Sequence, residues 1–88
     1  MKRPRILIVD DDTMVRIGLK TVIDWEENGF VLVGEAHDGR EALALAQERR
    51  PDIIITDIKM PGMDGIALIE RLRAQESPAE ILVLSSYD

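Results

Sequence analysis

The sequence contains no cysteine, a single histidine and no long apolar run. Without cysteine it can form neither disulfide bonds nor thiolate metal sites, which favours a cytoplasmic location. The basic start MKRPR precedes an apolar run that is too short for a signal peptide or a membrane-spanning helix. The formal net charge of -6 has the wrong sign for direct binding to nucleic-acid phosphates. We therefore expect no contact with membranes, and none with DNA through these residues.

The chain does contain four short apolar runs that alternate with amphipathic segments. Runs rich in branched residues suit strands that are buried on both faces of a parallel sheet. The expected strands are Arg5 to Val9, Phe30 to Ala36, Asp52 to Thr56 and Ile81 to Leu84. Between them, apolar residues recur at helical spacing, which predicts three helices. The order β-α-β-α-β-α-β predicts an α/β fold with a doubly wound parallel sheet.

Polar residues also predict where the second and third helices begin and end. Asp38 should cap the second helix, with Glu41 three residues later as its capping-box partner. Asp64 should cap the third helix. Pro51 and Pro78 are expected to end these two helices, because proline cannot continue a helix.

Carboxylates and hydroxyls follow three of the four expected strands. Asp10–Asp12 follow the first strand, Asp57 follows the third, and Ser85 and Ser86 follow the fourth. Ligands of such sheets bind outside the carboxyl ends of the strands. Crowded carboxylates without cysteine favour Mg²⁺ or Mn²⁺, and a metal-bound carboxylate can attack a phosphoryl group. The simpler alternative is that Asp10–Asp12 cap a helix, that Asp57 is a turn residue and that Ser85 is a loop hydroxyl.

Three stretches carry a family resemblance that covers essentially the whole chain. ILIVDDD, PDIIITDIKMPGMDG and ILVLSS resemble the receiver domain of bacterial two-component response regulators. The resemblance implies a flavodoxin-like (CheY-like) fold with the strand order 2-1-3-4. The stretch from Trp25 to Phe30 and the final SSYD resemble receivers joined to AraC-type helix-turn-helix domains. Transcriptional control would then act through a DNA-binding domain that is not part of these residues.

The resemblance also implies roles for individual residues in a phosphorelay. Asp57 would accept a phosphoryl group from a sensor histidine kinase. Asp10 and Asp11, with Asp57 and the backbone carbonyl of Lys59, would hold Mg²⁺ or Mn²⁺. The hydroxyl of Ser85 would sense the phosphoryl group.

Residues near these positions would have smaller roles. Asp12 would have a supporting role, and Pro61 and Gly65 would shape the loop beside Asp57. The chain would not be an enzyme beyond its own phosphorylation and hydrolysis.

The resemblance further implies elements that residues 1–88 do not contain. Receivers continue through a fourth helix, a fifth strand that ends in a lysine, and a fifth helix. The chain is thus expected to be the N-terminal two thirds of a receiver, with impaired phosphotransfer because one donor to the phosphoryl group is absent. The fourth strand would form an exposed sheet edge, so we expect the chain to self-associate there.

Two other functions compete with a phosphoaccepting receiver. The start ILIVDDDT resembles the first motif of haloacid dehalogenase-type phosphatases, with Asp10 as nucleophile and Asp12 as acid/base. Met14 departs from that motif, and the motif leaves the stretch from Asp57 to Gly65 unexplained. The second alternative is a scaffold with the receiver fold that binds partners without being phosphorylated.

Overall fold

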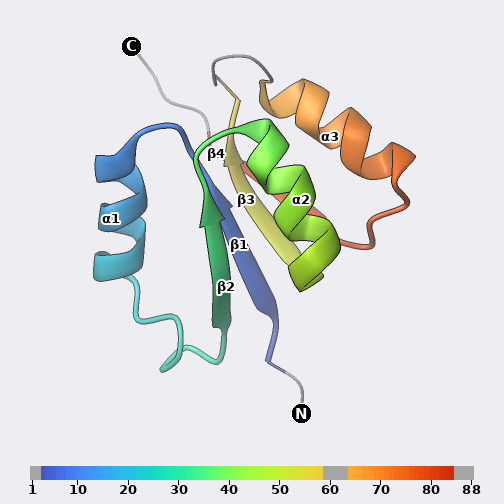
Figure 1. The fold of residues 1–88 in the computed structure, drawn as a ribbon. Coiled ribbons are helices and arrows are strands. Elements are labelled where there is room, and N and C mark those ends of the chain that lie inside the picture. Colours follow the sequence, from blue (N-terminus) through green and yellow to red (C-terminus); the bar gives the residue numbers. More distant parts are fainter. Residues whose placement is uncertain (1–2, 59–63, 85–88) are drawn as a thin grey trace.

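The computed structural model describes residues 3–58 and 64–84, and its elements alternate as the sequence predicts (Figure 1). The elements are β1 (Arg5–Val9), α1 (Thr13–Val22), β2 (Val31–Ala36), α2 (Gly39–Arg49), β3 (Ile53–Asp57), α3 (Gly65–Ala74) and β4 (Glu80–Leu84). The α/β fold class is therefore confirmed. No helix in these two ranges is long and apolar enough to cross a membrane.

The four strands form one parallel sheet in the order β2-β1-β3-β4. This is the flavodoxin-like order that the resemblance implied. Figure 1 shows α1 on one face of the sheet and α2 and α3 on the other. Because β1 and β3 are neighbours, with Val9 opposite Thr56, the residues that follow these two strands emerge side by side.

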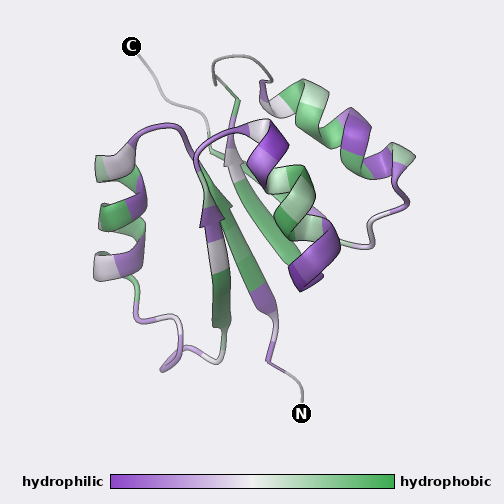
Figure 2. Cartoon of the chain, in the orientation of Figure 1, coloured by the Kyte–Doolittle hydropathy of each residue, from purple (hydrophilic) through white to green (hydrophobic). Residues whose placement is uncertain are grey.

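Alternate residues of the central strands build two separate cores, one on each face of the sheet. Leu7 and Ile54 face α2 and α3 and pack in a cluster with Leu68, whereas Ile8 and Ile55 belong to a second cluster on the face of α1. Figure 2 shows the apolar strands between helices that carry both polar and apolar stripes. Burial on both faces explains why the strands read as continuous apolar runs rather than alternating ones.

The predicted helix caps are largely correct. Asp38 accepts a hydrogen bond from the backbone N–H of Glu41 at 2.8 Å, as expected for an N-cap residue. The predicted reciprocal bond differs, because the Glu41 carboxylate accepts from the backbone N–H of His37 at 3.0 Å, one residue before the cap. Asp64 caps α3 by accepting from the backbone N–H of Ala67 at 2.8 Å.

The helix ends are set by backbone conformation rather than by proline alone. Arg50 has a positive φ of 47°, and its N–H closes α2 on the carbonyl of Ala46 one residue before Pro51. Helix α3 ends at Ala74, well before Pro78, because the backbone reverses at Glu76, where φ is 57°. Left-handed residues at these positions satisfy the last free carbonyls of a helix.

Strand β4 lies at the edge of the sheet and is less covered than the central strands. It pairs with β3, and its side chains Leu82, Val83 and Leu84 are 54%, 36% and 37% exposed. Its partner residue Ile55, one strand inward, is only 8% exposed. The apolar surface on β4 is thus continuous with the core.

Candidate metal centre at the carboxyl edge of the sheet

Three carboxylates that are distant in sequence meet where β1 and β3 end. One carboxylate oxygen each from Asp10, Asp11 and Asp57 lies within 4.8 Å of the other two. Asp10 is only 5% exposed, Asp57 is half-buried and Asp11 is exposed. The group is therefore open to solvent on one side, and its most constrained carboxylate lies at the base.

Asp10 is held by hydrogen bonds on both its backbone and its side chain. Its N–H donates to the carbonyl of Ala36 at 3.0 Å, which continues the pairing of β1 with β2. Its Oδ1 accepts from the backbone N–H of Asp12 at 2.9 Å. One hydrogen bond thus restrains the backbone of Asp10 and another restrains its carboxylate.

The surroundings of Asp10 make its ionised form less favourable than in a free aspartate. Burial raises the pKa of Asp10, the hydrogen bond from the Asp12 N–H partly offsets this effect, and the nearby charges of Asp57 and Asp11 raise the pKa further. A buried carboxylate beside two others is an unfavourable arrangement in the absence of a cation. A bound cation would relieve the repulsion directly.

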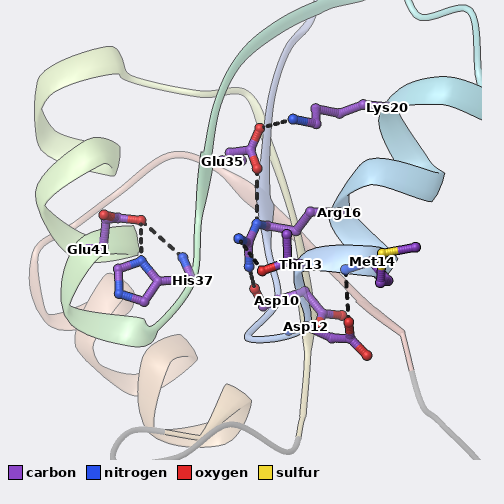
Figure 3. Close-up of polar contacts among 9 residues, drawn as sticks. All are labelled: Asp10, Asp12, Thr13, Met14, Arg16, Lys20, Glu35, His37 and Glu41. Carbon is purple, nitrogen blue, oxygen red and sulfur yellow. Dashed lines mark hydrogen bonds and ion pairs between the residues drawn. The ribbon is translucent and has the colours of Figure 1, made fainter.

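Asp12 does not belong to this group of three. Its side chain caps α1 by accepting from the backbone N–H of Met14 at 2.9 Å (Figure 3). The helix-cap alternative is therefore correct for Asp12, although Asp10 and Asp11 group with Asp57. The backbone N–H of Asp12 donates to the Asp10 carboxylate, and the supporting role predicted for Asp12 stays a prediction.

Helix α3 begins directly against the peptide that follows β3. The N–H of Gly65 donates to the carbonyl of Ile58 at 2.7 Å. A Cβ atom at Gly65 would lie 2.6 Å from the carbonyl oxygen of Asp57 and 2.9 Å from the Cα of Ile58, closer than real Cβ atoms approach. Only glycine allows α3 to lie this close to Asp57.

Arg16, which the sequence did not mark as a site residue, lies beside the acidic group. Its Nε donates to the Glu35 carboxylate at 2.9 Å, its Nη2 to the Thr13 hydroxyl at 3.3 Å, and its Nη1 to the backbone carbonyl of Asp10 (Figure 3). Lys20 donates to the other oxygen of Glu35. In the sequence, Arg16 is only an arginine at the end of the first turn of an amphipathic helix. Arginines at such positions are usually solvated, so nothing there indicated a site residue.

Two predicted site residues cannot be placed. Lys59 and Ser85, together with Pro61, lie outside the described residues 3–58 and 64–84. Their predicted roles stay predictions. His37 is placed, and its Nδ1 lies 2.9 Å from Glu41, so it contacts the start of α2.

The chemistry of the donor set fits a hard divalent cation. The three groups offer carboxylate oxygens, which Mg²⁺ and Mn²⁺ prefer, and neither cysteine nor histidine belongs to the group. Mg²⁺ usually binds through one or two carboxylates and keeps several waters, so a group that is open on one side suits it. The residues present therefore fit the metal that the resemblance implies.

The sequence matches the response regulator receiver domain family over residues 6–88. An uncharacterized transcriptional regulatory protein of Bacillus subtilis, YesN, is 40% identical over 83 residues, which cover 94% of this chain and 23% of that protein. The chain thus spans about a quarter of the length of this relative.

Solved structures agree with the sequence match. The receiver domain of the putative response regulator NarL from Mycobacterium tuberculosis superposes with a TM-score of 0.89 at 33% identity, covering all of this chain and 70% of that one. A two-component transcriptional regulator AraC from Clostridium phytofermentans gives a TM-score of 0.83 at 36% identity, covering 97% and 68%. The match favours the receiver family over the haloacid dehalogenase-type phosphatases, which the start ILIVDDDT also resembles. The chain belongs to the response regulator receiver domain family.

Proposed function

We propose that this chain accepts a phosphoryl group on Asp57 from a sensor histidine kinase and so relays a signal to an output domain. The observation that carries the proposal is the convergence of Asp10, Asp11 and Asp57 at the ends of two adjacent strands. A phosphoacceptor requires this combination, which places a nucleophilic carboxylate beside ligands for a cation.

Different residues would supply the nucleophile, the metal ligands and the hydrogen-bond donor for phosphoryl transfer. An oxygen of the Asp57 carboxylate attacks phosphorus, and the bond between phosphorus and the donor nitrogen of a phosphohistidine breaks. Asp10 and Asp11, with Asp57 and the backbone carbonyl of Lys59, would hold Mg²⁺, with Mn²⁺ as a substitute. When bound, the cation offsets the repulsion between the carboxylates and the anionic phosphoryl group. The Ser85 hydroxyl would donate to a phosphoryl oxygen.

The backbone around Asp57 is closely packed on both sides. Asp57 is the last residue of a strand whose preceding residue, Thr56, is fully buried. The backbone of Gly65 lies so close to Asp57 that a Cβ atom there would be 2.6 Å from the Asp57 carbonyl oxygen. Positioning of this kind supplies much of the rate in phosphoryl transfer.

The biological setting follows from the family and its relatives. The named relatives are transcriptional regulators, so we propose a transcriptional output through a DNA-binding domain outside these 88 residues. We also propose that the chain acts in the cytoplasm, and that it is a signalling protein rather than an enzyme with an external substrate.

The phosphoacceptor is tested by intact mass spectrometry after incubation with acetyl phosphate and Mg²⁺. We expect the wild-type chain to gain one phosphoryl group that hydroxylamine removes, as it removes acyl phosphates. Asp57→Asn should show no gain, and chelation of Mg²⁺ should suppress the gain in the wild type. No gain in the wild type would contradict the proposal. Mg²⁺ binding without phosphorylation would instead favour the scaffold alternative.

We further propose that a polypeptide of these residues associates with itself through β4. Among residues 3–58 and 64–84, strand β4 is an edge strand of the sheet, and it carries the exposed side chains of Leu82 and Leu84. Light scattering should then show a mass that rises with concentration. A constant monomer mass at high concentration would contradict this.

A further inference from the structure

We propose that Arg16 is a positioning residue for the metal centre, whose guanidinium holds the peptide between Asp10 and Asp11 and thereby orients both carboxylates. This inference rests on the proposed function, because it assigns Arg16 a task at the same site. Arg16 contacts Asp10 through a backbone atom, so it is not itself a ligand.

The guanidinium is held in place by three acceptors from three different segments. These are the carbonyl of Asp10 after β1, the hydroxyl of Thr13 in α1 and the carboxylate of Glu35 in β2 (Figure 3). The Arg16 side chain is only 12% exposed, so water competes little for these bonds. The planar fork of arginine serves such a set of acceptors, whereas a lysine can supply only a point charge.

A hydrogen bond to the Asp10 carbonyl affects the orientation of both Asp10 and Asp11. This carbonyl lies in the planar peptide unit that joins Asp10 to Asp11. The direction of this carbonyl depends on the ψ angle of Asp10 and on the φ angle of Asp11. A bond that holds the carbonyl therefore restrains both residues. The N–H of Asp10 is already tied to Ala36, so the bond from Arg16 completes the restraint of this backbone.

Glu35 keeps Arg16 in its position. It pairs with Arg16 through one oxygen and with Lys20 through the other, and it lies opposite Ile8 of β1 in the sheet. The hydrogen bond from Lys20, followed by that from Arg16, lowers the pKa of Glu35, and burial only partly opposes this. Glu35 therefore stays ionised at neutral pH and remains a strong acceptor.

A positioning role and a purely electrostatic role predict opposite results. If Arg16 were only a positive charge near three carboxylates, its removal would strengthen cation binding. If it contributed only an ion pair to stability, its removal would leave binding by the folded protein unchanged. A positioning role predicts weaker binding, because the carboxylates lose their shared orientation.

Lys20 provides a matched control for this comparison. Lys20 lies on the same helix as Arg16 and also donates to the Glu35 carboxylate, but it is not bonded to the Asp10 carbonyl. Lys20→Met therefore removes one positive charge and one bond to Glu35, as Arg16→Met does. The difference in Mg²⁺ affinity between Arg16→Met and Lys20→Met therefore reports the contribution of the contact with the Asp10 carbonyl.

The experiment is a Mg²⁺ titration followed by the backbone amide signals of Asp11 and Asp12 in NMR spectra of ¹⁵N-labelled protein. We expect Arg16→Met to weaken Mg²⁺ binding about tenfold, the low end for loss of an outer-shell partner. Arg16→Lys should lose less, and Lys20→Met should bind at least as tightly as wild type. The metal-free Arg16→Met protein should already show shifted Asp11 and Asp12 amides.

Mg²⁺ binding by Arg16→Met that matches wild type or Lys20→Met, or that exceeds them, would overturn the positioning role. If Arg16→Met does not fold, Arg16→Lys carries the same test, since it keeps the charge and loses the fork. Failure of the wild type to bind Mg²⁺ would refute the proposed function and this inference together. Normal wild-type binding with unchanged variants would refute the inference alone.

Discussion

Gly65 and Gly18 are both helical glycines, and replacing each by alanine should have opposite effects. Alanine in place of glycine inside a helix normally stabilises a protein by about 0.5–1 kcal/mol. At Gly18, in α1, a new Cβ meets nothing within 4 Å, so Gly18→Ala should show this gain. At Gly65 the new Cβ would lie 2.6 Å from the Asp57 carbonyl oxygen, so a clash competes with the gain.

The clash at Gly65 should outweigh the gain in helix stability. The obstructing atoms belong to the backbone of Asp57 and Ile58, so they cannot rotate away as a side chain would. Forcing extra volume into a packed site costs about 1–3 kcal/mol. Gly65 is also the first residue of α3, where the helix gain is smaller than in the interior. We therefore expect Gly65→Ala to lower the free energy of unfolding by about 1–2 kcal/mol.

The same clash should impair phosphorylation beyond the effect on stability. Relief of the contact requires the Asp57 peptide and α3 to separate by several tenths of an ångström, which moves the acceptor relative to Asp10 and Asp11. A misplacement of about 1 Å can cost about 100-fold in rate, so we expect a loss of about 10-fold or more.

Urea denaturation and the rate of phosphorylation by acetyl phosphate, both measured on wild type, Gly65→Ala and Gly18→Ala, check this reasoning. Phosphorylation is compared at a temperature at which every variant is fully folded by circular dichroism. Equal stabilisation by the two alanines would refute the close contact at Gly65. Wild-type phosphorylation by a destabilised Gly65→Ala would show that the contact supports folding and does not position Asp57.

Other substitutions test the site and its scaffold separately. Because the pKa of Asp10 is raised in the folded state, the folded protein binds this proton more tightly than the unfolded chain, and Asp10 lowers stability as pH rises above its ordinary pKa. Asp10→Asn should thus raise the urea midpoint of the metal-free protein at pH 7, with a gain that shrinks toward pH 4, while it weakens Mg²⁺ binding in titrations. Asp38→Ala removes the acceptor of the Glu41 N–H and should lower the free energy of unfolding by about 1 kcal/mol, as measured by urea denaturation. Leu68→Ala empties a fully buried position and should cost about 2–5 kcal/mol in the same assay. Leu82→Ser, at a 54% exposed position, should reduce self-association in light scattering and leave the urea midpoint nearly unchanged.

The alternation of strands and helices could be read from the sequence because it follows from local patterns. The run from Ile6 to Val9 is apolar and buried at every position, as expected for a strand that is covered on both faces of the sheet. The position of Asp57 at the end of β3 follows from the same pattern. The end of α3 was predicted less well than the end of α2 at Arg49, since the left-handed Glu76 carries no clear sequence signal.

The roles of the three consecutive acids were decided by tertiary structure. Asp10, Asp11 and Asp12 are chemically alike, and the residues alone left open whether they cap a helix or hold a metal. The family resemblance implied the metal for Asp10 and Asp11 and a supporting role for Asp12. The register of β1 against β3 brings Asp10 and Asp11 to Asp57, while the start of α1 directs Asp12 to the N–H of Met14.

The contacts of Arg16 and the close approach of Gly65 to Asp57 also became visible only in three dimensions. The sequence by itself determined the fold class and the family, and it led to the proposal of Asp57 as acceptor, because these depend on patterns within short stretches. Arg16 matters because α1 packs beside β2 and brings it to Glu35 and to the Asp10 carbonyl. Gly65 matters because α3 starts in contact with the backbone of Asp57. Such contacts join residues that are distant in the chain, and only the packing of the elements decides which of them meet.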